Sequence, residues 1–187
     1  MVSSRCPSGS LTGIRGRSIL AEVAVGGTTF VVGSFHATPG TGQVGGVEVH
    51  EWKPFFHGAL ALELAGIDRP FVFGIDGNEP LAETVDTIKF HWEDDRSGVK
   101  KLQALLGLEP THRGRDLFRE WLATSRAKPA SAEVLFATYA PEPVFQRRFD
   151  SIWATPDFAL DEFATHLDEV VSAGGDHAML VADLRLG

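Results

Sequence analysis

The stretch PFVFGIDGNEP, residues 70–80, joins a short apolar run to a polar turn. Its first six residues are almost all apolar and include two phenylalanines, which is typical of a strand buried on both faces. Asp76, Gly77 and Asn78 follow at once, and all three are common turn formers. A buried strand that ends in a carboxylate and an amide places polar side chains at a rigid edge beside a loop, where enzymes concentrate their chemistry.

Three other sites along the chain share this pattern of a polar side chain at a strand end or turn. His36 follows the run TTFVVGSF, Asp150 precedes SIWAT, and Asp176 and His177 precede AMLVADLRL. Taken singly, each of these residues is an ordinary turn former. Together with Asn78 they suit one reaction, because oxygen ligands hold a hard cation and imidazoles move protons near neutral pH.

The hydrophobic pattern predicts an α/β fold with helices and strands alternating early and strands dominating later. Two β-branched and aromatic runs around Gly26-Gly27 predict a hairpin, and helical spacing of apolar residues predicts a helix over 47–65. The other expected elements are helices over 98–107 and 114–127, strands over 132–138, 149–155 and 178–186, and a mobile stretch over 156–168.

Composition excludes some classes of function. The 187 residues contain 17 Lys and Arg against 25 Asp and Glu, a net charge of −8. This argues against binding nucleic acid through a broad basic face. An acidic enzyme could still bind phosphates through a bound cation, which reverses the local charge. Cys6 is the only cysteine, which permits a cytoplasmic location. No secretory signal and no apolar run long enough to span a membrane is present.

Other polar residues receive separate interpretations. Arg148 lies two residues before Asp150 and could bind a phosphate by bidentate hydrogen bonds, although a salt bridge at the sheet edge explains it nearly as well. His57 is expected on the solvated face of its helix, and His112 at the surface.

Four segments of the chain match, in order, the motifs of a known family: VVGSFHATPG, FVFGIDGN, RRFDSIWAT and GGDHAMLVADL. On these segments the sequence resembles the endonuclease/exonuclease/phosphatase superfamily. Ile75 stands where that family has Gly, and Gly175 stands where it has Ser. The resemblance implies a two-sheet β-sandwich flanked by helices, with a loop-like start over 1–18 and a single domain over 19–187.

The resemblance also implies that the chain is N-terminally incomplete and holds the C-terminal two thirds of the family domain. Family members begin with strands that supply an early Asn and a Glu, and the Glu is the principal protein ligand of the metal. No segment before Val23 supplies these residues. A sheet that lacks its first strands would expose an edge and favour association with another chain.

Carried over to the matching positions, the resemblance implies hydrolysis of a phosphoester by activated water, with Mg²⁺ or alternatively Mn²⁺ as the cofactor. Asp76 would orient or deprotonate the water and contact the metal, and Asn78 would hold that water or a phosphate oxygen. His177 would sit against the scissile phosphate, with Asp150 fixing its tautomer and raising its basicity.

Two further roles follow from the same resemblance. His36 would act as general acid for the leaving oxygen, and Asp176 would contact the metal or its water shell. Three functions stay open on this basis: a nuclease or phosphodiesterase acting on DNA or RNA, a phosphomonoesterase acting on a lipid or sugar phosphate, and an inactive or partial family member that binds a partner.

Overall fold

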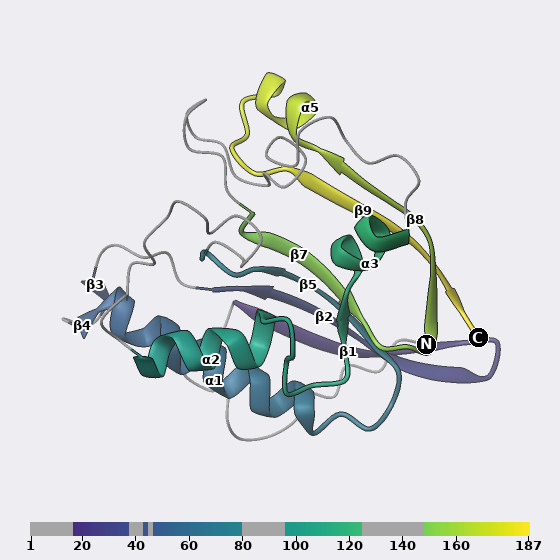
Figure 1. Ribbon diagram of the computed structural model, residues 1–187, viewed down its shortest axis with the longest axis horizontal. Helices are drawn as coiled ribbons and strands as arrows, with labels where there is room; N and C mark the ends of the chain where they lie inside the picture. The colour runs from purple at the N-terminus through teal and green to yellow at the C-terminus, as the bar shows by residue number, and fades with distance from the viewer. Residues whose placement is uncertain (1–16, 38–42, 45–46, 80–95, 125–147) are drawn as a thin grey trace.

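The computed structural model describes residues 17–37, 43–44, 47–79, 96–124 and 148–187 (Figure 1). The predicted strand over 132–138 and nearly all of the loop-like start lie outside these residues. None of the helices within them is long and apolar enough to cross a membrane. The elements in chain order are β1 (Ser18–Val25), β2 (Thr28–His36), β3 (Gln43–Val44), β4 (Val47–Glu48), α1 (Val49–Ala65), β5 (Phe71–Asp76), α2 (Arg96–Leu106), β6 (Arg115–Asp116), α3 (Leu117–Thr124), β7 (Asp150–Ala154), β8 (Phe158–His166), α5 (Leu167–Ser172) and β9 (Met179–Leu186).

The first two strands form the predicted hairpin. β1 pairs antiparallel with β2, with Val25 opposite Thr28. Gly26 and Gly27 between them have φ values of 59° and 88°. Glycine adopts this left-handed region without steric cost, so the two-residue turn forms readily and fixes the register of the hairpin.

The central sheet has five strands in the order β1-β2-β5-β7-β6. β2 runs parallel to β5, and β7 runs antiparallel to β5. The carboxyl ends of β2 and β5 therefore meet the amino end of β7 at one edge of the sheet. β1 lies at the outer side of this order and exposes Ile19 and Val25.

Side chains of the sheet alternate between two cores because successive residues of a strand point to opposite faces. Phe71, Phe73 and Ile75 of β5 are buried in one cluster with apolar side chains of α1 and α2. Val72 belongs to a second cluster with α3, β8 and β9. Figure 1 shows α1 and α2 on one side of the sheet and α3 with the β8-β9 pair on the other. The predicted two-sheet sandwich flanked by helices is confirmed.

Two stretches differ from the prediction. The stretch over 156–168, expected to be mobile, contains β8, which pairs with β9 from Phe158 to His166. At a register shift between Leu160 and Glu162, the consecutive residues Asp161 and Glu162 are both exposed, which interrupts the alternation that identifies a strand in the sequence. The helix expected over 114–127 begins only at Leu117, because Arg115 and Asp116 pair with β7.

Arg148 forms a buried ion pair with Asp116. Its Nη2 lies 2.6 Å from both carboxylate oxygens of Asp116, and the two side chains are 2% and 1% exposed. The guanidinium also lies 4.6 Å from the ring centroid of Phe118, which is a cation–π contact. The expectation that Arg148 binds a substrate phosphate is therefore wrong, because its side chain is buried and its guanidinium is bound within the protein.

Replacing Arg148 by methionine keeps a long apolar side chain and removes the positive charge. We expect the free energy of unfolding to fall by up to about 3–5 kcal/mol, because the buried carboxylate of Asp116 loses its shortest ion pair and keeps only Arg119 Nε, at 3.6 Å, as a charged partner among the described residues. Urea unfolding followed by circular dichroism measures the change.

The matched control is Arg185→Met, which breaks an ion pair with Asp161 whose side chains are mostly exposed. Exposed pairs contribute about 0–1 kcal/mol, so this variant should differ little from the wild type. Equal small losses in both variants would contradict the interpretation of the buried pair.

Candidate active site

Three of the predicted site residues lie side by side across the sheet. His36 ends β2, Asp76 ends β5 and Asp150 begins β7, and the register places His36 opposite Asp76 and Asp76 opposite Asp150. Residues opposite one another share a face of the sheet. Ile75 points toward α1 and α2, so Asp76, one residue later, points to the face on which β9 lies.

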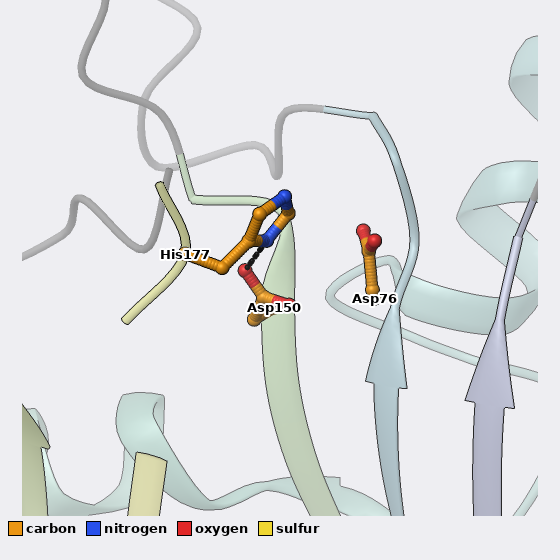
Figure 2. Close-up of side chains that lie close together, drawn as sticks. All are labelled: Asp76, Asp150 and His177. Carbon is orange, nitrogen blue, oxygen red and sulfur yellow. Dashed lines mark hydrogen bonds and ion pairs between the residues drawn. The ribbon is translucent and has the colours of Figure 1, made fainter. Parts of the chain in front are cut away.

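His177 reaches the same place from a distant part of the chain. It lies in the connection between α5 and β9, and its ring Nδ1 is 2.9 Å from Asp150 Oδ2. Because a carboxylate only accepts hydrogen bonds, Nδ1 carries a proton and donates a hydrogen bond to Asp150. Figure 2 shows His177 approaching from its loop while Asp76 and Asp150 come from neighbouring strands. One ligand atom from each of the three residues lies within 4.8 Å of the others.

The turn after β5 holds Asp76 in place. The backbone N–H of Asn78 donates to Asp76 Oδ1 at 2.8 Å, and its side-chain Nδ2 donates to Asp76 Oδ2 at 2.9 Å. The same Nδ2 donates to the carbonyl of Ala37, directly after β2, at 2.9 Å. Asn78 has a φ of 50°, in the left-handed region that Asn tolerates better than most residues. Both oxygens of Asp76 are therefore oriented by one residue.

The electrostatics of the site follow from two carboxylates sharing a partly buried place. Burial raises the pKa of Asp76, and the negative charge of Asp150 raises it further. The hydrogen bond to Asp150 raises the pKa of His177 above its ordinary value, although burial of the ring opposes this. The first shift favours a proton on Asp76, and the second favours the imidazolium form of His177. A metal ion bound at this point would supply positive charge in the same way.

His36 and Asp176 lie at the margin of this group. His36 Nε2 is 3.4 Å from Asp76 Oδ2, and its side chain is 58% exposed. Asp176 is exposed and lies outside the group of three, although its charge contributes to the raised pKa of His177. The structure thus brings His36, Asp76, Asn78, Asp150 and His177 together and leaves Asp176 at the rim.

A hollow of about 300 Å³ adjoins the two carboxylates. Its walls come from β2, β5, β7 and the start of β9, and include Asp76, Asp150 and Gly74. A Cβ atom added to Gly74 would meet no atom within 4 Å, so the sheet is open beneath the site. A second hollow, between β1 and the end of α1, contains none of the predicted site residues.

Sequence reasoning missed a buried polar cluster beneath the turn. Lys53 Nζ lies 2.5 Å from Glu79 Oε1 and 2.8 Å from the carbonyl oxygen of Asn78. His57 Nε2 lies 3.3 Å from the carbonyl oxygen of Gly77. Lys53 and His57 are four residues apart and so lie on one face of α1, a spacing that could have indicated a shared polar contact.

Two histidines expected at the surface are buried. His57 is 0% exposed and His112 is 5% exposed. Burial, followed by the charge of Lys53, lowers the pKa of His57 to about 3, so its ring is neutral at physiological pH. His112 lies between Phe71, Phe73 and Trp153 and has its Nε2 2.8 Å from the carbonyl oxygen of Leu105.

The pKa of His177 should lie above the ordinary histidine value of about 6.5, because Asp150 stabilises the charged ring. In Asp150→Asn it should be lower than in the wild type. An NMR pH titration of the imidazole resonances measures both values. His112, whose pKa is lowered by burial, serves as the internal control and should titrate alike in both proteins.

The same shift has a consequence for stability. Since folding raises the pKa of His177, the stabilisation from its pair with Asp150 is fully present below pH about 6.5 and is lost as pH rises through the raised pKa. The difference in unfolding free energy between wild type and Asp150→Asn should shrink over that range. A difference that grows with pH would contradict the assignment.

Comparison with protein-family models finds no match, and comparison with curated proteins finds none either. Solved structures do match. An AP endonuclease from Archaeoglobus fulgidus is similar with a TM-score of 0.63 and 18% identity, over 99% of this chain and 70% of that chain. An endonuclease/exonuclease/phosphatase from Beutenbergia cavernae is similar with a TM-score of 0.54 and 20% identity, over 91% of this chain and 39% of that chain.

D. rerio TDP2, solved in complex with a single-strand DNA product, is similar with a TM-score of 0.55 and 14% identity. The match covers 90% of this chain and 61% of that chain. The present chain thus spans between 39% and 70% of the length of these three structures. The resemblance seen in the four sequence segments is confirmed in three dimensions: the chain has the fold of the endonuclease/exonuclease/phosphatase superfamily.

Proposed function

We propose that the protein is a metal-dependent phosphoesterase that hydrolyses a phosphodiester, such as that of DNA or RNA, by attack of water. The observation that carries this proposal is the convergence of Asp76, Asp150 and His177 within 4.8 Å, with the His177–Asp150 hydrogen bond at 2.9 Å. Two structures with the same fold are an AP endonuclease and a protein bound to a DNA product, which supports this substrate class.

The donor set fits a hard divalent cation such as Mg²⁺, with Mn²⁺ as the alternative. Asp76 and Asp150 offer carboxylate oxygens, and Mg²⁺ in proteins is usually held by one or two carboxylates together with waters. Asp176 at the rim would contact the water shell. Burial and the charge of Asp150 raise the pKa of Asp76, so a bound cation would stabilise its ionised form. When bound, the cation would neutralise charge that develops on the phosphoryl oxygens.

Asp76 orients and deprotonates the attacking water. Its two oxygens are fixed by Asn78, so the carboxylate is held in one orientation before substrate arrives. A carboxylate with a raised pKa is also a stronger base than an ordinary aspartate. The side-chain amide of Asn78 lies beside this carboxylate and supplies a carbonyl acceptor for the same water.

His177 and His36 have different roles at the phosphate. His177 binds the scissile phosphoryl group as an imidazolium, because Asp150 holds the proton on Nδ1 and favours the charged ring. His36 protonates the leaving oxygen, a role that its exposure and its position 3.4 Å from Asp76 permit. The hollow beneath the carboxylates gives room for groups attached to the phosphate.

One observation favours a second candidate. The net charge of −8 disfavours long nucleic acids, whose binding depends on neutralising many phosphates. A phosphomonoesterase acting on a lipid or sugar phosphate would use the same residues and would need fewer positively charged side chains to bind its substrate.

We expect Mg²⁺-dependent hydrolysis of bis(p-nitrophenyl) phosphate, and loss of that activity on addition of EDTA. His177→Ala and Asp76→Asn should each lower kcat by about 100-fold or more, since a positioned acid or base contributes about 10²–10⁴-fold. Arg185→Met is the control, because Arg185 pairs with exposed Asp161 toward the far end of β9. Unchanged turnover in His177→Ala would remove that residue from its role.

Parallel assays distinguish the substrates. Plasmid DNA and p-nitrophenyl phosphate are compared at two salt concentrations, and nicking of DNA that weakens at high salt supports the nuclease assignment. Hydrolysis of the monoester alone supports the second candidate. Absence of turnover with every ester, in folded protein with Mg²⁺ or Mn²⁺, would contradict both and leave a binding role.

A further inference from the structure

Side chains of α1 bind three successive residues of the turn after β5. Gly77 is contacted through its carbonyl by His57, Asn78 through its carbonyl by Lys53, and Glu79 through its carboxylate by Lys53. These are the residues that directly follow Asp76. The side chains of Lys53, His57 and Glu79 are all buried.

Stability alone gives a weak reason for this cluster. Burial lowers the pKa of Lys53, and the charge of Glu79 opposes that shift. Placing two charged groups in the interior costs the desolvation of both. A buried ion pair contributes no more than well-packed apolar side chains of similar volume in many proteins. What apolar side chains could not supply is a hydrogen bond to the carbonyl of Asn78.

We propose that Lys53, held by Glu79, is a positioning residue for the active site: it fixes the turn that orients Asp76. The connection is continuous. Lys53 Nζ binds the Asn78 carbonyl at 2.8 Å, and the backbone and side-chain nitrogens of Asn78 bind the two oxygens of Asp76 at 2.8 and 2.9 Å. The left-handed φ of Asn78 is a conformation that neighbouring contacts must maintain.

This inference rests on the proposed function for its kinetic consequence, but its structural part does not. The ring of His57 acts in the same direction, because it is neutral and can donate its Nε2 proton to the Gly77 carbonyl without introducing a second buried charge. Neither Lys53 nor Glu79 is proposed to touch substrate.

The decisive variant is the double substitution Lys53→Met with Glu79→Leu. Both charges are removed together, so no uncompensated charge is left in the interior, and apolar side chains of similar size fill the space. Either single substitution leaves its partner charged and buried and is more prone to unfold. The double variant therefore separates the loss of the Asn78 hydrogen bond from a general loss of stability.

The matched control is Leu64→Ala. Leu64 is buried in the same helix, eleven residues beyond Lys53, which is about 16 Å at 1.5 Å per residue. Its truncation destabilises the core without touching the turn. Urea unfolding of both variants shows how much of any change in rate follows from stability.

We expect the double variant to lower kcat for bis(p-nitrophenyl) phosphate by about 10–100-fold with KM changed less than about threefold, because misplacement of a reacting group by about 1 Å costs on the order of 10²-fold in rate. Leu64→Ala should keep wild-type kcat. Wild-type kcat in the folded double variant would overturn the proposal.

A second readout does not depend on activity. Amide hydrogen exchange at Asn78, whose N–H donates to Asp76, should become at least tenfold faster in the double variant, while the amides within β5 keep their wild-type rates. In Leu64→Ala the ratio of the Asn78 rate to the β5 rates should not change. Unchanged exchange at Asn78 in the double variant would overturn the positioning role, even if the wild type proved to have no esterase activity.

Discussion

Backbone hydrogen bonds in the central sheet hold His36 opposite Asp76 and Asp76 opposite Asp150, and the rest of the site depends on this register. A strand has a side-chain period of two, so a slip of one residue in β7 would turn Asp150 toward α1 and α2 and remove it from His177. Packing in the core opposes this slip, because Trp153 is buried on the side of α1 and α2 and Ala154 is buried on the side of α3, β8 and β9. The packing that stabilises the sheet is thus also what aligns the polar row at its edge.

That alignment places two carboxylates close together, and the surrounding residues compensate for their repulsion. His177 contributes a hydrogen bond to Asp150, and Asn78 contributes two to Asp76. Burial nonetheless raises the pKa of Asp76 and the charge of Asp150 raises it further, so part of the repulsion between the two carboxylates remains. Sites that keep such an imbalance sacrifice stability for chemistry, and a bound cation would remove the repulsion. Lys53 and His57 of α1 bind the same turn from the opposite side. The position of Asp76 therefore depends on the sheet, the turn and this helix.

The sequence was sufficient for the parts of this arrangement that depend on local pattern. The apolar run before Asp76, the Gly-Gly turn and the polar residues at strand ends each carry a signal within a few residues. The two-sheet fold was expected from the resemblance of four ordered segments to a known family. Arg148, His57 and His112 could not be placed in this way, because their burial depends on partners 20 or more residues away or on packing from several elements. β8 was missed because Asp161 and Glu162 are both exposed at its register shift, which interrupts the alternation of buried and exposed residues. Local pattern predicts which residues end a strand, and tertiary packing decides which polar side chains are buried.

The central claim is that residues from β2, β5, β7 and the loop before β9 form one cation-binding site. The most direct measurement is an NMR titration of the folded protein with Mn²⁺, following the assigned imidazole resonances. A paramagnetic ion at this site should broaden His36 and His177 together at substoichiometric concentration and more strongly than His112, which packs against Phe73 and Trp153, three residues from Asp76 and Asp150, and Mg²⁺ should reverse the effect by competition. Equal broadening of all the histidines, or broadening of His36 and His177 at different Mn²⁺ concentrations, would contradict a single shared site.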